Sequence, residues 1–195
     1  MPRRLVLSGM MLLIFAASAF SQKGGEVFGG YSYQRTGDTG LNGFNASITG
    51  NMNSWLGLTG EISHHTYGTS VLEPISGFAV NADAGLLAFR VGPKFTSRVT
   101  DTTSLFIHTL AGGYRASVGV NATGVNAPLQ NFSVNTSATG FTAAAGAGLD
   151  VRIAPRVAVR PVQMDWIYLG SAVIGGQDMG DSNGFRYSGG IVFRF

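Results

Sequence analysis

The most regular feature of the chain is an alternation of apolar and polar residues with a period of two. Between Phe44 and Met52, apolar side chains alternate with asparagine, serine and threonine. The last segment, Gly184–Phe195, repeats the pattern with aromatic residues at Phe193 and Phe195. Successive side chains of a strand point to opposite faces, so each segment predicts a strand with one apolar and one polar face.

Eight segments of this kind follow one another along the chain. They are 26–35, 44–52, 55–65, 84–95, 104–116, 140–153, 157–168 and 184–195. A strand needs roughly 9–11 residues to cross a bilayer at a tilt. The pattern therefore predicts an all-β fold, an eight-stranded antiparallel up-and-down transmembrane β-barrel with lipid outside and a polar interior. The faces of 104–116 stay open, because a bulge near Gly112-Gly113 would exchange them.

The connections between the segments alternate in length. Those at 51–54, 96–103 and 154–156 are short, whereas 66–83, 117–139 and 170–183 are long and 36–42 is intermediate. Outer-membrane barrels have short periplasmic turns and longer external loops. We therefore expect both chain ends in the periplasm and the longer connections outside the cell, where they are candidates for ligand binding.

Residues 1–21 have the pattern of a secretory signal peptide. Arg3 and Arg4 precede the apolar stretch Leu5–Ala17, and cleavage after Ala19 or after Ser21 fits the small residues that follow. The apolar stretch is shorter than the roughly 20 residues of a spanning helix. We therefore expect an exported chain with two parts, the signal peptide 1–21 and the barrel 22–195.

Composition narrows the class further. Only 12% of the residues are charged and 29 are glycine, whereas a soluble domain has ~25% charged residues. No run of basic residues is present, which argues against a nucleic-acid partner. The absence of cysteine excludes disulfides and thiolate metal sites. The spacing of the three histidines predicts no metal site, and we expect no cofactor.

The segments together resemble the barrel domain of the outer-membrane protein A family, over roughly residues 26–195. The residues that carry the resemblance are Phe89–Gly92, Ala145–Asp150, Ala154–Arg160 and Gly189–Phe195. The resemblance implies a bacterial outer-membrane location and a barrel closed by ion pairs rather than an open pore. The chain has no sequence after the barrel that would correspond to the family's peptidoglycan-binding domain.

The resemblance also implies an ionic network inside the barrel. Carried over by motif, its members are Arg90, Asp150 and Arg160, with Glu61 as the preferred fourth member and Thr59 as the alternative. The wider set of charged residues that we expect on the interior face is Glu61, Arg90, Lys94, Asp150, Arg152, Arg160, Arg186 and Arg194. An eight-stranded barrel is just wide enough for side chains to fill, so a packed polar plug is favoured over an ion path.

The closing strand carries a second implied feature. Tyr187, Ile191, Phe193 and Phe195 resemble the C-terminal signal that the outer-membrane barrel assembly machinery recognises in this family. The expected partners are therefore that machinery, the bilayer and its lipopolysaccharide, and an extracellular ligand at the loops.

Three other functions remain as alternatives to a structural or surface-interaction role. One is a channel for small solutes or hydrophobic molecules, and one is a soluble, lipocalin-like barrel. The third is a lipid-modifying enzyme that uses Glu61, Ser63 and His65, which share one strand face. Neighbours on one face lie ~6.6–7 Å apart, beyond hydrogen-bond reach, so we expect no enzyme and no catalytic residues.

Overall fold

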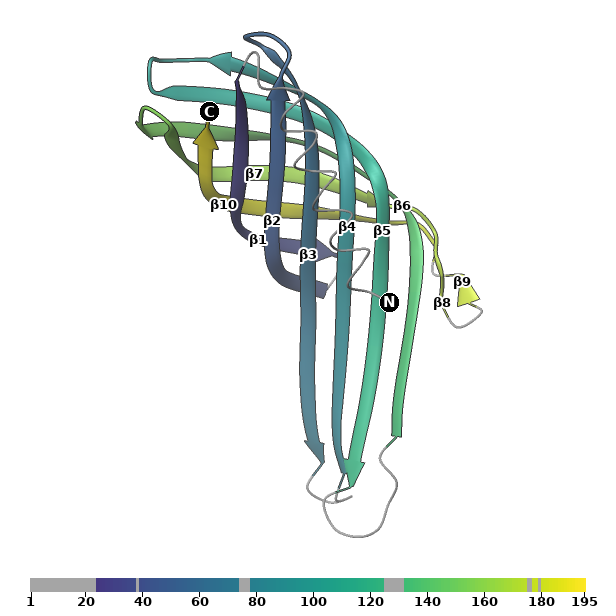
Figure 1. Ribbon diagram of the computed structural model, residues 1–195. Coiled ribbons are helices and arrows are strands. Elements are labelled where there is room, and N and C mark those ends of the chain that lie inside the picture. Colours follow the sequence, from purple (N-terminus) through teal and green to yellow (C-terminus); the bar gives the residue numbers. More distant parts are fainter. Residues whose placement is uncertain (1–23, 38, 74–77, 125–131, 175–176, 179) are drawn as a thin grey trace.

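Eight long antiparallel strands close into a barrel in the computed structural model (Figure 1), which describes residues 24–37, 39–73, 78–124, 132–174, 177–178 and 180–195. The barrel strands are β1 (Gly25–Thr36), β2 (Thr39–Asn51), β3 (Leu56–Glu73), β4 (Phe78–Arg98), β5 (Thr103–Gly124), β6 (Phe132–Ala154), β7 (Val157–Leu169) and β10 (Ser182–Arg194). The short strands β8 (Val173–Ile174) and β9 (Gln177–Asp178) pair with each other. Within the barrel each strand pairs with its neighbours along the chain, and β1 pairs with β10. The predicted eight-stranded up-and-down barrel is confirmed. The expected signal peptide lies outside the described residues.

No helix among the described residues has the length and apolar character needed to cross a membrane.

The two faces of the wall differ as the alternation predicts. On β2, the Phe44 side chain is 48% exposed whereas its neighbour Asn45 is 1% exposed. On β10, Phe193 faces outward and Arg186 faces the interior. The exterior is therefore apolar and the interior polar, which is the arrangement expected of a barrel surrounded by lipid.

The chain ends meet at the end of the barrel that has the short turns. Gly25 and Phe195 exchange two backbone hydrogen bonds, with N–O distances of 2.8 and 2.9 Å. The connections 52–55, 99–102 and 155–156 lie at this same end, because the strand count is even and every pair is antiparallel. We call it the short-turn end.

A shift of register occurs in β7 at a proline, and a second one, between Arg152 and Ala154 of β6, lies beside the β6–β7 turn. Arg160 and Gln163 both face the interior, whereas Pro161 and Val162 between them do not. Proline has no N–H to donate to a neighbouring strand, and a bulge accommodates it. The pairing of β7 with β10 and with β6 shifts by one residue here.

The bulge considered near Gly112-Gly113 is not present. The pairing of β5 with β4 and β6 keeps one register across these glycines. The open question about the faces of β5 is thereby settled: Phe106, His108 and Leu110 point into the barrel, and Ile107 points outward.

The prediction that 66–83 and 117–139 are loops was wrong for most of both stretches. Here β3 with β4, and β5 with β6, continue as ladders of paired residues. Figure 1 shows β3, β4, β5 and β6 reaching far past the end of the other strands. Serine, threonine and asparagine are common in turns, but their backbones extend a ladder equally well when a neighbouring strand is present. We call these continuations the extended sheet.

Two other connections also differ from their expected form. The link expected at 36–42 is shorter, because β2 already begins at Thr39 and Gly37 turns the chain with a positive φ of 57°. The loop expected at 170–183 contains the hairpin of β8 and β9.

Candidate functional site in the barrel interior

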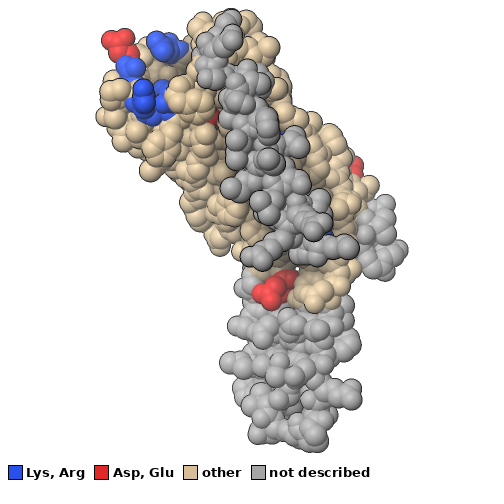
Figure 2. Space-filling view, in the orientation of Figure 1, with Lys and Arg blue, Asp and Glu red and all other residues tan. Residues whose placement is uncertain are grey.

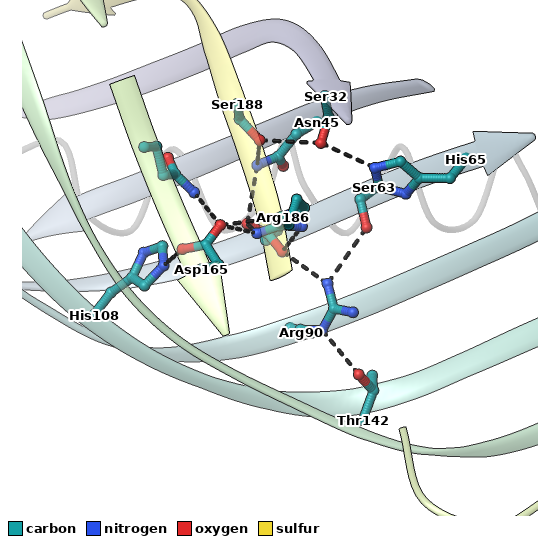
Figure 3. Close-up of polar contacts among 12 residues, drawn as sticks. Ser32, Asn45, Ser63, His65, Arg90, His108, Thr142, Asp165, Arg186 and Ser188 are labelled. Atoms are coloured by element: carbon teal, nitrogen blue, oxygen red, sulfur yellow. Dashed lines mark hydrogen bonds and ion pairs between the residues drawn. The ribbon is translucent and has the colours of Figure 1, made fainter. Parts of the chain in front are cut away.

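The centre of the barrel is occupied by an arginine held between two carboxylates. Arg186 on β10 donates to Glu61 on β3, with distances of 2.8 Å to Oε1 and 2.6 Å to Oε2. It also donates to Oδ2 of Asp165 on β7, at 2.9 Å from Nε and 2.7 Å from Nη2. All three residues are at most 5% exposed. This arrangement ties three strands together across the lumen (Figure 3).

Two further side chains complete what we call the central cluster, consisting of Glu61, Arg90, His108, Asp165 and Arg186. Arg90 donates to Glu61 Oε1 at 3.0 Å and to Oγ1 of Thr142 at 3.1 Å. His108 Nε2 lies 2.7 Å from Asp165 Oδ1. Glu61 and Asp165 balance the charges of the two arginines, so the centre of the lumen is filled and electrically compensated.

A second group lies nearer the short-turn end, and we call it the mouth cluster: Glu26, Lys94, Asp150, Arg160 and Arg194. Arg160 donates to both carboxylate oxygens of Asp150, at 2.7 and 3.2 Å, and Arg194 donates to the same carboxylate at 3.2 Å. Lys94 pairs with Glu26.

Aromatic rings pack against the cations of the mouth cluster. The Arg160 guanidinium carbon lies 4.3 Å from the Phe28 ring centroid and 4.2 Å from that of Phe106. Lys94 lies over the Phe106 ring as well, at 4.2 Å. Rings and cations in this geometry attract one another, and they leave little room beside the charged groups.

Gln163 joins the two clusters into one network. Its Oε1 accepts a hydrogen bond of 2.8 Å from Arg160, and its Nε2 donates to Asp165 at 2.9 Å. Hydrogen bonds and ion pairs therefore run without a break from Arg194 at the short-turn end to Arg90 in the centre of the barrel.

The structure brings the four predicted network residues together as two pairs. Glu61 pairs with Arg90, and Asp150 pairs with Arg160, in different clusters. Thr59, the alternative to Glu61, shares a hydrogen bond of 2.8 Å with Thr49 and joins no ion pair among the described residues.

Arg152 was expected on the interior face, and its pairing with the buried Ala158 places it on that face, but at the open mouth of the barrel and outside the ionic network. Its side chain is exposed at the short-turn end and bonds to the carbonyl of Asp101. Arg152 follows the register shift between Leu149 and Val151 and stands close to the end of β6 at Ala154.

Asp165 of the central cluster and Glu26 of the mouth cluster were not predicted. Counting in twos from Arg160 places Asp165 on the outer face, and only the bulge at Pro161 turns it inward. A proline inside an otherwise regular strand is the signal that could have revealed the change of face. Glu26 stands at the first position of its segment, where the alternation has too few preceding residues to assign a face.

Ser63 and His65 do not form a nucleophile–base pair. The Ser63 hydroxyl accepts a 3.3 Å hydrogen bond from Arg90, whereas His65 Nε2 lies 2.9 Å from Oγ of Ser32 on β1 (Figure 3). Both side chains are at most 1% exposed. A serine and a histidine with separate partners and no access to substrate lack the geometry of a hydrolase.

The end of the lumen opposite the short turns is closed by apolar side chains. Leu86, Ala88, Tyr114, Ala138 and Ala172 form a buried cluster. The Tyr114 hydroxyl donates to the Gly170 carbonyl at 2.7 Å, which fixes the chain after β7 against this cluster. The polar network therefore has an apolar cap on one side. No group of three metal-ligating side chains occurs among the described residues.

The residues of the predicted assembly signal all point away from the lumen. Tyr187, Ile191, Phe193 and Phe195 are 43–56% exposed on the outer face at and after β10. The Tyr187 hydroxyl donates to the carbonyl of Pro161 at 2.7 Å, next to the register shift.

Comparison with solved structures finds the same fold in outer-membrane proteins. The chain is similar to the attachment invasion locus protein Ail of Yersinia pestis in complex with the heparin analogue sucrose octasulfate, with a TM-score of 0.57 and 19% identity over 89% of this chain and 100% of that one. It is also similar to Neisserial surface protein A (TM-score 0.53, 13% identity, 88% of this chain and 96% of that one). A third similar structure is the outer membrane protein OprG of Pseudomonas aeruginosa, with a TM-score of 0.53 and 10% identity over 89% of this chain and 96% of that one.

No family model matches the sequence, and no curated protein matches it either. The likeness to solved structures confirms the fold that the resemblance to the outer-membrane protein A family implies, a closed eight-stranded barrel of the outer-membrane type.

Proposed function

We propose that the protein is an integral outer-membrane barrel with a closed interior that uses its extended sheet to bind partners outside the cell. An apolar exterior supports insertion in the bilayer and contact with lipopolysaccharide, since Phe89, Ile107 and Phe141 are each more than half exposed. Export through a cleaved signal peptide, 1–21, and insertion by the barrel assembly machinery belong to the same proposal.

A closed interior is favoured over a channel because two different barriers lie in series. A solute would have to displace the Arg186 guanidinium from its two carboxylates and also pass the apolar cap of Leu86 and Tyr114. Separating buried charges costs several kcal/mol per ion, on the order of 3–5 kcal/mol for a broken pair. The same ion pairs connect several barrel strands across the lumen and thereby stabilise the barrel, which is a structural role.

The observation that carries the binding role is the extended sheet itself. Where the extended sheet joins the barrel, the polarity of the two faces is reversed: the cap residues Leu86, Tyr114 and Ala138 face inward, whereas Asp83 and Arg115 face outward. A sheet with a polar outer face needs no lipid, which is consistent with a position outside the membrane.

Among the described residues, neither edge of the extended sheet is paired with a further strand. β2 pairs with β3 only as far as Thr66, and β7 pairs with β6 only from Thr142 onward. An unpaired edge presents backbone N–H and C=O groups that can bind another extended segment. The partner that fits is therefore an extended polypeptide that adds as a strand, with apolar residues alternating toward the inner face.

The orientation of the β6 backbone identifies which residues face this edge. The Phe141 carbonyl accepts a hydrogen bond from Gly170, so it points to the β7 side. Because the N–H and C=O of alternate residues in an antiparallel strand point the same way, Ser137 also directs its backbone toward that side, where β6 has no paired strand among the described residues. The β6 edge from Phe132 to Gly140 contains no lysine and no proline, residues that commonly block exposed edges.

A proline substitution at Ser137 tests whether a partner strand binds to the β6 edge. Ser137→Pro removes one edge N–H and keeps the bonds to β5, whereas Ser137→Val keeps the edge N–H and loses the same hydroxyl contact with Arg115. The probe is a fluorescent peptide with the sequence of residues 115–124, which is the natural neighbour of β6 on its other edge. We expect anisotropy to show binding to the wild type and to Ser137→Val, with clear loss in Ser137→Pro.

Equal binding by the two variants, or no binding by the wild type, would contradict strand addition at this edge. The migration of each variant in unheated and heated gel samples shows whether the barrel itself has folded.

A further inference from the structure

The surface of the short-turn end is basic. Its exposed or half-exposed charged residues are Arg98, Asp101, Arg152, Arg156 and Arg194, a net formal charge of +3. At the opposite end the described exposed charges, Arg35, Arg115, Asp83 and Asp181, cancel. Figure 2 shows blue side chains gathered at the end of the molecule where Figure 1 places the C-terminus.

The arginines of this end are held close together by the turns. The Arg194 backbone N–H donates to the Arg156 carbonyl at 2.8 Å, and the Arg152 guanidinium bonds to the turn that contains Asp101. That turn directly follows Arg98 at the end of β4. Four cationic side chains from the ends of two turns and the closing strand therefore form one basic rim, namely Arg98, Arg152, Arg156 and Arg194.

Two of the four have no side-chain partner among the residues that the structure describes. Among the described residues, Arg98 and Arg156 make no side-chain hydrogen bond and no ion pair, whereas Arg194 is shared with Asp150 and Glu26. Arginine carries several N–H donors in a fixed fork that suits phosphate oxygens. The rim therefore offers two unpaired guanidinium groups to an anionic partner.

Apolar neighbours place the rim at a membrane boundary rather than in free solution. Arg98 is followed by Val99, which is 58% exposed, and Arg152 is followed by Ile153, which is 65% exposed. Arg194 stands between Phe193 and Phe195. Cationic side chains directly beside lipid-facing apolar ones lie at the depth of the head groups.

A stacked aromatic pair marks the same depth. Trp55 and Phe95 lie at the short-turn end with ring centroids 5.9 Å apart, and both are exposed. Aromatic girdles of this kind stand at the membrane–water interface of outer-membrane barrels. Arg98 is only three residues beyond Phe95 on β4.

We propose that the basic rim binds the phosphates of anionic phospholipids in the membrane leaflet that surrounds the short-turn end. The preference is for an anionic head group such as phosphatidylglycerol over the zwitterionic phosphatidylethanolamine. This binding surface is separate from the extended sheet and does not depend on the polypeptide partner proposed for it.

The test is native mass spectrometry of the full chain released from nanodiscs made of equal parts phosphatidylglycerol and phosphatidylethanolamine. The wild type is expected to retain phosphatidylglycerol preferentially. In Arg98→Gln/Arg156→Gln the preference falls, by about fivefold for each arginine removed, since a cation near an anionic surface contributes ~1 kcal/mol. Arg35→Gln/Arg115→Gln, which removes the same charge at the opposite end, leaves the preference unchanged.

A second measurement uses the unmodified protein, so that a folding defect of the variant cannot decide the outcome. Raising the salt concentration before release weakens the preference of the wild type, because exposed charges are screened. Equal retention of the two lipids by the wild type, or an undiminished preference in the rim variant, would overturn the proposal. The proposal would also be overturned if inorganic phosphate displaced the retained lipid as effectively as added phosphatidylglycerol does, because the rim would then be a site for free anions.

Discussion

Arg186 is the side chain whose loss tests the interior network most severely. It is 1% exposed and makes four hydrogen bonds, two to Glu61 and two to Asp165. Arg186→Met keeps most of the volume and removes the charge. The central cluster then holds two buried carboxylates and only one arginine, Arg90.

The expected loss of unfolding free energy depends on the hydrogen-bond partners that Glu61 and Asp165 keep after the substitution. Glu61 keeps its 3.0 Å contact with Arg90, and Asp165 keeps its contacts with His108 and Gln163. The loss should therefore resemble one broken buried pair rather than two, about 3–5 kcal/mol in the free energy of unfolding. Arg186→Met/Asp165→Asn restores charge balance, and we expect it to recover much of that loss.

Urea unfolding of protein refolded in detergent micelles measures the difference, with the fluorescence of Trp55 and Trp166 as the signal. Arg115→Met, at an exposed arginine, is the matched control and should change the midpoint little. The reasoning fails if Arg186→Met unfolds within ~0.5 kcal/mol of the wild type, a difference typical of an unremarkable surface change. It also fails if the double variant is no more stable than the single one.

Two further predictions concern the wall. Gly146→Ala should destabilise the barrel by about 1–3 kcal/mol, because the added methyl would overlap the Asp165 carboxylate. Gly60→Ala is the control and should be nearly neutral, since the nearest atom to its added methyl is 3.9 Å away. Equal urea midpoints for the two variants would contradict this prediction. Deleting Phe195 should lower the yield of membrane-inserted, heat-modifiable protein in cells more than it lowers the stability of the purified, refolded barrel; a normal cellular yield would count against the assembly signal.

The barrel could be predicted from the sequence because one rule holds inside the membrane. Lipid requires an apolar outer face, and a narrow lumen filled with polar groups makes the other face polar, so residues such as Phe44 and Asn45 alternate clearly. The faces of β5 were harder to assign, because Phe106 and Leu110 point inward although they are apolar. Phe106 packs on cations and Leu110 joins Ala144 and Ile167, which are environments that only the folded barrel creates.

The extended sheet and the full network could not be predicted for two different reasons. In the position proposed for the extended sheet, outside the bilayer, the outer face no longer has to be apolar, so Asp83 interrupts the pattern that identifies a strand in the membrane. Inside it, one proline changes the register of β7, and Asp165 reaches the lumen at a position that simple alternation assigns to lipid.

Single-channel recording on the purified barrel in planar bilayers tests the central claim most directly. A lumen filled by the network around Arg186 and capped by Leu86 and Tyr114 predicts no steady conductance in the wild type. Long-lived open events of uniform size in the wild type would contradict the closed interior and favour a channel.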